Sequence, residues 1–245
     1  MIFSQSKLLN KFTNLAHAFT KKESGNLAFH VNDNPLHVEH NHEVLAKELN
    51  YNKNKLVHMK QIHSNSIHIV NENDNFYNPK TCDALITNKL NTPLMVMVAD
   101  CSPILFYDDE KKVIAVAHAG RAGAFKNIIK VVVESFKNDF NSQISSLHVA
   151  IGASIGVCCY EVGVEIYKEA KELNLEYAIE IKDNKYFLDI RKILKKQLLT
   201  CSVKEENIEI TNECTSCLNK KYFSYRADAK CGRFAGVIYM KLQII

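Results

Sequence analysis

Three strand-like apolar runs follow one another at the centre of the chain, within residues 94–123. They occupy residues 94–99, 104–107 and 113–117, and polar or turn-forming residues separate them. Short apolar runs bounded by turn signals are typical of buried strands. The chain is therefore predicted to contain a buried sheet. The polar residues at the breaks between the runs would lie at strand ends, which makes them candidates for functional residues.

The breaks between these runs contain candidate metal ligands. Cys101 follows the first run, between Asp100 and Ser102, and His118 follows the third. If these strand ends lie side by side, a thiolate and an imidazole share one rim, and that donor pair suits zinc or copper. From these residues alone, a buried thiol and a hydrogen-bonded core histidine are the favoured alternative.

Composition restricts the class of protein. Hydrophobic residues make up 47% and charged residues 24% of the 245 positions, as in ordinary globular proteins. The net charge of +4 comes without a Lys/Arg cluster on an aromatic-rich strand, so we expect no nucleic-acid partner. Without a signal peptide or long apolar span, we expect no membrane association, a cytoplasmic location and eight reduced cysteines. We also expect a monomer or weak oligomer.

The pattern along the chain predicts an α+β fold in a single domain covering residues 1–245, because helical and strand-like segments alternate without a linker or repeat. Asn32, Asp33 and Asn34 are candidate caps of a helix that begins near Pro35. The expected helices cover residues 35–49, about 122–140, 161–173 and 191–199. Besides the central runs, the expected strands cover residues 56–59, 66–70, 147–151, 186–190, 208–211 and 234–242.

Further motifs lie on both sides of the central stretch. They are Gln61-Ile62-His63-Ser64, Cys82-Asp83-Ala84, residues 151–163, Tyr222-Phe223-Ser224-Tyr225-Arg226 and Cys231-Gly232-Arg233. In this order, with Cys101 and His118 between them, these segments resemble the bacterial laccase-domain family. Its members carry the labels polyphenol oxidase, purine nucleoside phosphorylase and peptidoglycan-editing factor. The resemblance extends from about residue 26 to 239 and implies a layered α/β/β/α arrangement with mixed sheets.

The resemblance implies that His63, Cys101 and His118 are both the metal ligands and the catalytic centre. Two imidazoles and one thiolate leave a tetrahedral zinc ion with one open position, which is the mark of a catalytic site. Zinc is the expected metal and copper the alternative. Asp100 is a candidate for orienting a ligand by a hydrogen bond, or else a turn-forming residue.

Asn26, Asn41, Arg121 and Arg226 are the candidate substrate-binding residues. Arg121 lies in a Gly-Arg-Ala-Gly segment at a predicted helix start, where backbone N–H groups favour an anion; a tight strand-to-helix turn is the alternative. The family usually has Trp and Arg after His-Ala-Gly, whereas this chain has Arg121 and Ala122 and no tryptophan. Arg226 and, less strongly, Arg233 are candidates for holding phosphate or a carboxylate, with surface ion pairs as the alternative.

The other histidines and cysteines carry weaker signals. His37, His40 and His42 are expected on a solvated helix, because His42 points away from the face that the other two share. Cys214 and Cys217 have the spacing of a zinc knuckle, but no second such pair completes a site, so a turn is expected. The adjacent residues Cys158 and Cys159 are not expected to bind one ion, and Cys159 is a candidate to face the pocket.

The expected function is that of a zinc-dependent purine nucleoside phosphorylase, which cleaves inosine or adenosine with phosphate. The resemblance also implies adenosine deaminase and methylthioadenosine phosphorylase activities, so both transferase and hydrolase chemistry are open. A copper polyphenol oxidase is the first alternative, although the chain has only one His-X-His pair, His40-Asn41-His42. A hydrolase that edits cell-wall precursors is the second alternative. The sequence does not distinguish a protein that acts on such precursors from one that acts on nucleosides.

Overall fold

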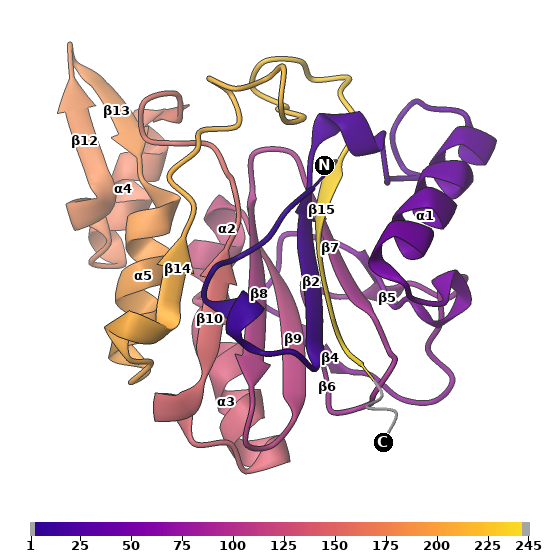
Figure 1. Cartoon of the computed structure of the whole chain (residues 1–245). Helices are drawn as coiled ribbons and strands as arrows, with labels where there is room; N and C mark the ends of the chain where they lie inside the picture. The colour runs from indigo at the N-terminus through magenta and orange to yellow at the C-terminus, as the bar shows by residue number, and fades with distance from the viewer. Residues whose placement is uncertain (1–2, 242–245) are drawn as a thin grey trace.

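Two β-sheets lie face to face at the centre of the computed structural model, which describes residues 3–241 (Figure 1). The first sheet is antiparallel, with the order β1 (Phe3–Ser4), β2 (Leu15–Thr20), β15 (Phe234–Met240), β7 (Leu94–Val98). The second sheet is mixed, with the order β14 (Ile208–Ile210), β10 (His148–Ile151), β8 (Ser102–Asp108), β9 (Val113–Ala119), β6 (Ala84–Thr87), β4 (Ile67–Ile69). Its outer pairs β10–β14 and β4–β6 are parallel.

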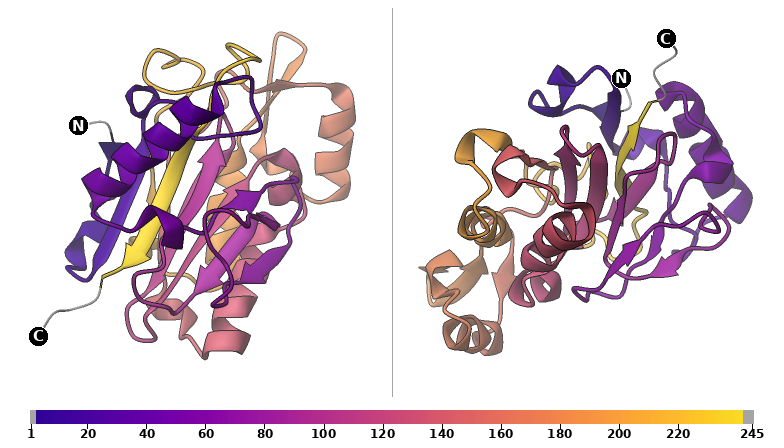
Figure 2. Two further views of the ribbon diagram at one scale, coloured as in Figure 1. Left: turned by 90° about the vertical axis from the view of Figure 1, so that its right-hand side faces the viewer. Right: turned by 90° about the horizontal axis from the view of Figure 1, so that it is seen from below.

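Helices cover the outer face of each sheet. The described helices are α1 (Pro35–Leu49), α2 (Arg121–Phe125), α3 (Ile128–Phe140), α4 (Val164–Glu172) and α5 (Ile190–Thr200). The view from below in Figure 2 shows α1 on one outer side and α3 with α5 on the other. Two smaller sheets complete the fold, β11 (Glu161–Val162), β13 (Lys185–Leu188) and β12 (Ile179–Lys182) in one, and β3 (Met59–Lys60) with β5 (Lys80–Thr81) in the other.

This α/β/β/α layering in a single compact domain confirms the expected fold class. Buried apolar residues form three layers, one between the sheets and one under the helices on each side. The central strands β7, β8 and β9 are buried along their whole length, because both faces of each strand are covered. Strand β2 is equally buried, and the sequence did not predict it.

The predicted helix from residue 122 to 140 is in fact two helices. Asn127 adopts a left-handed conformation with φ of 56°, which interrupts the helix after α2. Its side chain accepts a hydrogen bond from the Lys130 N–H and so begins α3. The expected helix from residue 161 begins only at Val164, because residues 161–162 form strand β11.

Two further predictions need correction. Ile190, placed at the end of a strand, is the first residue of α5, since Asp189 accepts a hydrogen bond from the Lys192 N–H. The last predicted strand ends at Met240 as β15, and Leu242 lies outside the described residues. None of the described helices is long and apolar enough to cross a membrane.

Helix α1 begins at Pro35 as predicted, with Asn34 as its cap. The interpretation of its histidines as solvated holds for His37 and His40 but is wrong for His42, which is 0% exposed. The His42 Nε2 donates to the Leu27 carbonyl at 2.8 Å. Burial lowers the pKa of His42 to about 4, so this imidazole is a neutral part of the core.

Candidate active site

His63, Cys101 and His118, called here the His-Cys-His site, lie together at one edge of the sheets. Cys101 falls between β7 and β8, and the pairing of Pro103 with His118 across β8 and β9 brings the thiol beside the imidazole. His63 comes from the segment between β3 and β4, with φ of 58°. The candidate ligand atoms of all three residues lie within 4.8 Å of one another, and Cys101 Sγ is 4.0 Å from His63 Nε2. Strand pairing thus collects three donors from distant parts of the chain.

Asp83, which the sequence analysis did not select, supports this group from behind. One carboxylate oxygen accepts from His118 Nδ1 at 2.8 Å and from the His63 N–H at 3.1 Å. The other accepts from the N–H and hydroxyl of Ser64, each at 2.7 Å. When His118 is neutral and donates its Nδ1–H, its Nε2 lone pair is free for a metal. The signal available in the sequence was the Cys82-Asp83-Ala84 motif, in which Asp83 precedes a buried strand.

The electrostatics of the site favour charged forms of its buried groups. Burial alone would raise the pKa of the Asp83 carboxyl, but hydrogen bonds from His118 and Ser64 hold it well below its usual range. Burial would likewise raise the pKa of the Cys101 thiol, but His118 and His63 lower it below the ordinary value. The pKa of His118 is raised, because its attraction to Cys101 and Asp83 outweighs burial. A thiolate, the form of cysteine that binds metals, is therefore favoured at Cys101.

A cavity of about 320 Å³ opens in front of the His-Cys-His site. This volume is at the lower end of the range for small-molecule pockets, which is about 300–1,000 Å³. The cavity combines apolar, aromatic and cationic side chains, with Met97, Val98, Ile155, Ile190, Tyr160, Tyr225, Arg121, Arg226 and Arg233 among its lining residues. The three donors are thus closed on the Asp83 side and open on the cavity side.

Two of the cavity arginines have only neutral acceptors. Arg226 donates to the backbone carbonyls of Cys159 at 2.8 Å and Glu161 at 3.0 Å. Arg233 donates to the carbonyls of Cys231 and Gly232. Within residues 3–241 neither guanidinium forms an ion pair with a carboxylate, so their positive charge is available to an anionic ligand.

Arg121 also lines the cavity but already has an anionic partner. Its guanidinium donates to the Glu169 carboxylate of α4 at 2.6 Å, and both side chains are about one-third to two-fifths exposed. Gly120 precedes Arg121 at the start of α2, as expected for the strand-to-helix turn. A Cβ atom on Gly120 would lie 2.8 Å from Cys101 Sγ, so glycine is required here for the close approach of the thiol.

Asp100 contacts a different part of the site from the one expected. Its carboxylate accepts from the Thr215 hydroxyl at 2.6 Å and from the Arg226 N–H at 2.7 Å. It therefore positions the segment that carries Arg226, whereas Asp83 orients the donors. That segment, between β14 and β15, runs across the top of the sheets in Figure 1.

Asn26 and Asn41 lie behind the cavity lining. The Asn26 side chain accepts from the N–H groups of Arg233 at 2.8 Å and Ala28 at 3.0 Å. Asn41 donates to the Asn26 carbonyl at 2.9 Å. The structure thus brings His63, Cys101, His118, Arg121 and Arg226 together around one cavity, and places the two asparagines where they hold the Arg233 backbone.

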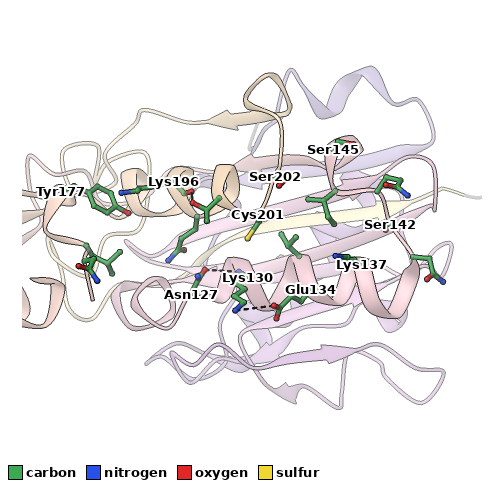
Figure 3. A pocket seen from close by; sticks show the side chains of 18 residues that line it. Asn127, Lys130, Glu134, Lys137, Ser142, Ser145, Tyr177, Lys196, Cys201 and Ser202 are labelled. Atoms are coloured by element: carbon green, nitrogen blue, oxygen red, sulfur yellow. Dashed lines mark hydrogen bonds and ion pairs between the residues drawn. The ribbon is translucent and has the colours of Figure 1, made fainter. Parts of the chain in front are cut away.

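A larger hollow of about 1020 Å³ lies elsewhere, between α3 and α5 (Figure 3). Lys130, Lys137 and Lys196 contribute to it, and Lys196 lies over the Tyr177 ring at 3.8 Å. It shares no lining residue with the smaller cavity, and its residues include no group of three metal-binding side chains among those the structure describes. Of these two, the smaller cavity is the one that holds a group of three candidate metal ligands, and the pKa values of Cys101 and His118 in that group are shifted by their mutual attraction. It is therefore the candidate active site.

The fold and the site define a class: an α/β/β/α protein with two imidazoles and a thiolate at the edge of a cationic cavity. The chain belongs to the family described as multi-copper polyphenol oxidoreductase laccase, which matches residues 15–241. This match confirms the family resemblance seen in the motifs.

Curated relatives carry another label. The chain is 38% identical to a purine nucleoside phosphorylase of Clostridium acetobutylicum over 78% of this chain and 79% of the relative. It is 31% identical to the purine nucleoside phosphorylase YfiH of Escherichia coli, over 89% and 87% of the two chains.

Solved structures share the whole fold. The hypothetical protein YfiH of Bacillus licheniformis matches with a TM-score of 0.89 and 28% identity over 95% of this chain and 94% of that one. YlmD of Geobacillus stearothermophilus matches with a TM-score of 0.88 and 26% identity over 98% and 99%.

Proposed function

We propose that this protein is a zinc-dependent purine nucleoside phosphorylase that acts on inosine and adenosine. The observation that carries the proposal is the open side of the His-Cys-His site, which faces a cavity with three guanidinium groups. The names of the curated relatives support the same reaction class. The family resemblance adds adenosine deamination and methylthioadenosine phosphorolysis as activities of the same cavity.

His63, Cys101 and His118 would hold the zinc ion. The donor set fits zinc, because neutral imidazole and thiolate are its usual ligands and Asp83 fixes the orientation of His118. A bound zinc ion supplies a positive charge and Lewis acidity at the cavity edge. Multicopper oxidation needs several histidine-rich centres, whereas the other ligand group among the described residues contains only sulfur. We therefore favour zinc over copper.

The cavity residues bind and orient the two substrates. Arg226 and Arg233 would hold phosphate next to the ribose, because neither has a carboxylate partner among the described residues. Arg121 would add a third positive charge if its guanidinium left Glu169 and bound the phosphate. Tyr225, which is 56% exposed, offers an aromatic face for the purine. This aromatic ring would take the place of the tryptophan that the chain lacks.

The reaction requires mainly positioning and charge. An oxygen of phosphate forms a bond to C1′ of the ribose while the bond from C1′ to the base nitrogen breaks. The electron pair of that bond leaves with the base, which takes up a proton. The guanidinium groups hold the phosphate anion beside the positive charge that develops on the ribose. Because these groups are already in position, they need not reorganise during the reaction.

Incubation with inosine, with and without phosphate, followed by mass spectrometry tests the proposal. We expect hypoxanthine and ribose 1-phosphate only when phosphate is present, from protein that contains zinc. Protein with stoichiometric zinc that consumes neither inosine nor adenosine would overturn it. Copper together with oxidation of a phenol would establish the oxidase alternative, and hydrolysis of amino-acid–sugar conjugates would establish the cell-wall one.

A further inference from the structure

Four cysteines that the proposed function does not use lie together outside the cavity. Cys158, Cys159, Cys214 and Cys217, called here the thiol cluster, have their Sγ atoms within 4.8 Å of one another. From the sequence, the Cys214–Cys217 pair was predicted to be isolated, and the adjacent residues Cys158 and Cys159 were not expected to bind one ion. The structure contradicts the first expectation, because the adjacent pair Cys158 and Cys159 lies beside Cys214 and Cys217 and could supply the missing half of a four-sulfur group.

The topology of the second sheet brings these segments together. Strands β10 and β14 are parallel neighbours, with Ile151 paired with Ile210, so the segments that follow them leave the same edge. A bridge between Ser154 and Cys214 extends this pairing, and the Thr215 N–H donates to the Ser154 carbonyl at 3.1 Å. The segments that lead to the two cysteine pairs therefore lie side by side.

The distances between sulfur atoms are close to those of a tetrahedral metal site. Cys217 Sγ is 3.3 Å from Cys159 Sγ and 3.6 Å from Cys158 Sγ. Four thiolates around one zinc ion, each about 2.3 Å from the metal, lie about 3.8 Å apart. A disulfide requires about 2.05 Å, and all eight cysteines of the chain are unbridged.

The backbone around the cluster supports anionic sulfur. The N–H groups of Gly156 and Cys217 donate to Cys214 Sγ, the first at 3.2 Å. A Cβ atom on Gly156 would lie 3.2 Å from Cys158 Sγ and 2.8 Å from a guanidinium nitrogen of Arg191. Glycine therefore lets the chain approach the sulfur atoms closely, and Arg191 places a positive charge near them.

We propose that the thiol cluster binds one structural zinc ion through all four sulfur atoms. Four thiolates complete a tetrahedral zinc shell and leave no position for substrate. Sulfur-only ligation selects soft metals and excludes magnesium and calcium. This second site is separate from the His-Cys-His site and does not depend on which reaction the cavity performs.

The proposed metal would stabilise one side of the active-site cavity. Arg226 donates to the carbonyl of Cys159, and the next residue, Tyr160, lines the cavity. Thr215, within the Cys214–Cys217 turn, donates to Asp100, whose carboxylate also accepts from the Arg226 N–H. Fixing the four sulfur atoms therefore fixes the backbone that positions Arg226.

Zinc content of the full chain, measured with a set of single variants, tests the proposal. We expect two zinc ions per wild-type chain, one in Cys101→Ser, one in Cys217→Ser and none in the double variant. Cys201→Ser is the matched control, because this cysteine lies in the distant hollow beside α5, and it should keep two. Cys217→Ser should also unfold at a lower temperature than Cys201→Ser.

Several results would overturn the proposal. Zinc content that is the same in wild type and Cys217→Ser, or iron in place of the metal that Cys217→Ser loses, would each do so. One zinc ion per wild-type chain that Cys217→Ser loses and Cys101→Ser keeps would instead contradict only the zinc assigned to the His-Cys-His site. A deficit of two thiols in denatured, unreduced protein, restored by reductant, would identify a disulfide instead. If Cys217→Ser does not fold, Cys158→Ser replaces it, and cobalt-substituted Cys101→Ser protein must then show thiolate-to-cobalt absorption that Cys101→Ser/Cys158→Ser lacks.

Discussion

The His-Cys-His site and the thiol cluster are built from similar donors but differ in every surrounding feature. The first gathers mixed donors at strand ends, with the buried Asp83 carboxylate behind them and a cavity in front. The second gathers sulfur alone from two loop segments, with backbone N–H groups as its support and no place in that cavity. Three donors beside a cavity leave room for chemistry, whereas four mutually close donors close the coordination shell. The number and surroundings of the ligands therefore separate a catalytic from a structural role.

The largest expected effect comes from Cys101→Ser, which replaces a soft thiolate by a weak ligand. We expect nucleoside turnover to fall on the order of 100-fold or more and zinc to leave this site, because losing a direct ligand exceeds the loss of a supporting contact. The unfolding temperature should stay close to that of Cys201→Ser. A variant that keeps full turnover would remove Cys101 from the site, and one that unfolds would make this metal structural as well.

Asp83→Asn tests the supporting contact rather than a ligand. The amide keeps the shape of the carboxylate but loses the charge that holds His118, so zinc affinity or activity should fall roughly 10–100-fold. The low pKa of Asp83 also predicts an effect on stability. In metal-free wild type its contribution is present above the ordinary carboxyl pKa of about 4 and lost as pH falls towards the lower folded-state value.

Acid unfolding of the metal-free proteins checks that second effect. Wild type should lose stability more steeply than Asp83→Asn as the pH falls below about 4, because only wild type must protonate this carboxylate. Asp228→Asn, a change at a residue outside the cavity lining, is a suitable control. Parallel curves for Asp83→Asn and wild type would mean that the carboxylate charge contributes little to the site.

The two groups should also differ in thiol reactivity once metal is removed. The lowered pKa of Cys101 leaves it as thiolate near neutral pH, whereas hydrogen bonds with Cys159 and Cys158 raise the pKa of Cys217. Alkylation of Cys101 should therefore persist at a lower pH than that of Cys217. Peptide mapping after brief iodoacetamide treatment across a pH series measures this. If Cys217 is alkylated faster than Cys101 at low pH, Cys217 and not Cys101 has the lower thiol pKa, and the prediction is wrong.

The smallest effect is expected at Arg121, because its guanidinium is already paired with Glu169. Arg121→Ala should raise KM for phosphate more than KM for nucleoside, since the guanidinium would contact the anion. Glu169→Gln should lower KM for phosphate, because it frees Arg121 from its ion pair. If Arg121→Ala leaves both constants within about twofold, ~0.4 kcal/mol, Arg121 serves only the pair with Glu169. Lys130→Ala, in the distant hollow, is the control.

The sequence by itself determined the local elements and part of the site. The runs at residues 94–99, 104–107 and 113–117 are strands, because a short apolar segment between turn residues has few other stable states. Asn34 and Pro35 determined the start of α1 in the same local way. The ordered motifs further identified His63, Cys101 and His118 as candidates before any contact was known.

Tertiary structure alone decided which distant residues meet. Cys159 and Cys217 are 58 positions apart, and only the parallel pairing of β10 with β14 brings them together. The selection of Asp83 over Asp100 as partner of His118 depends on the pairing of β6 with β9. The burial of His42 depends on packing that its helical position does not reveal. Local propensity acts over a few residues, whereas strand pairing sets the neighbours of a side chain across the whole chain.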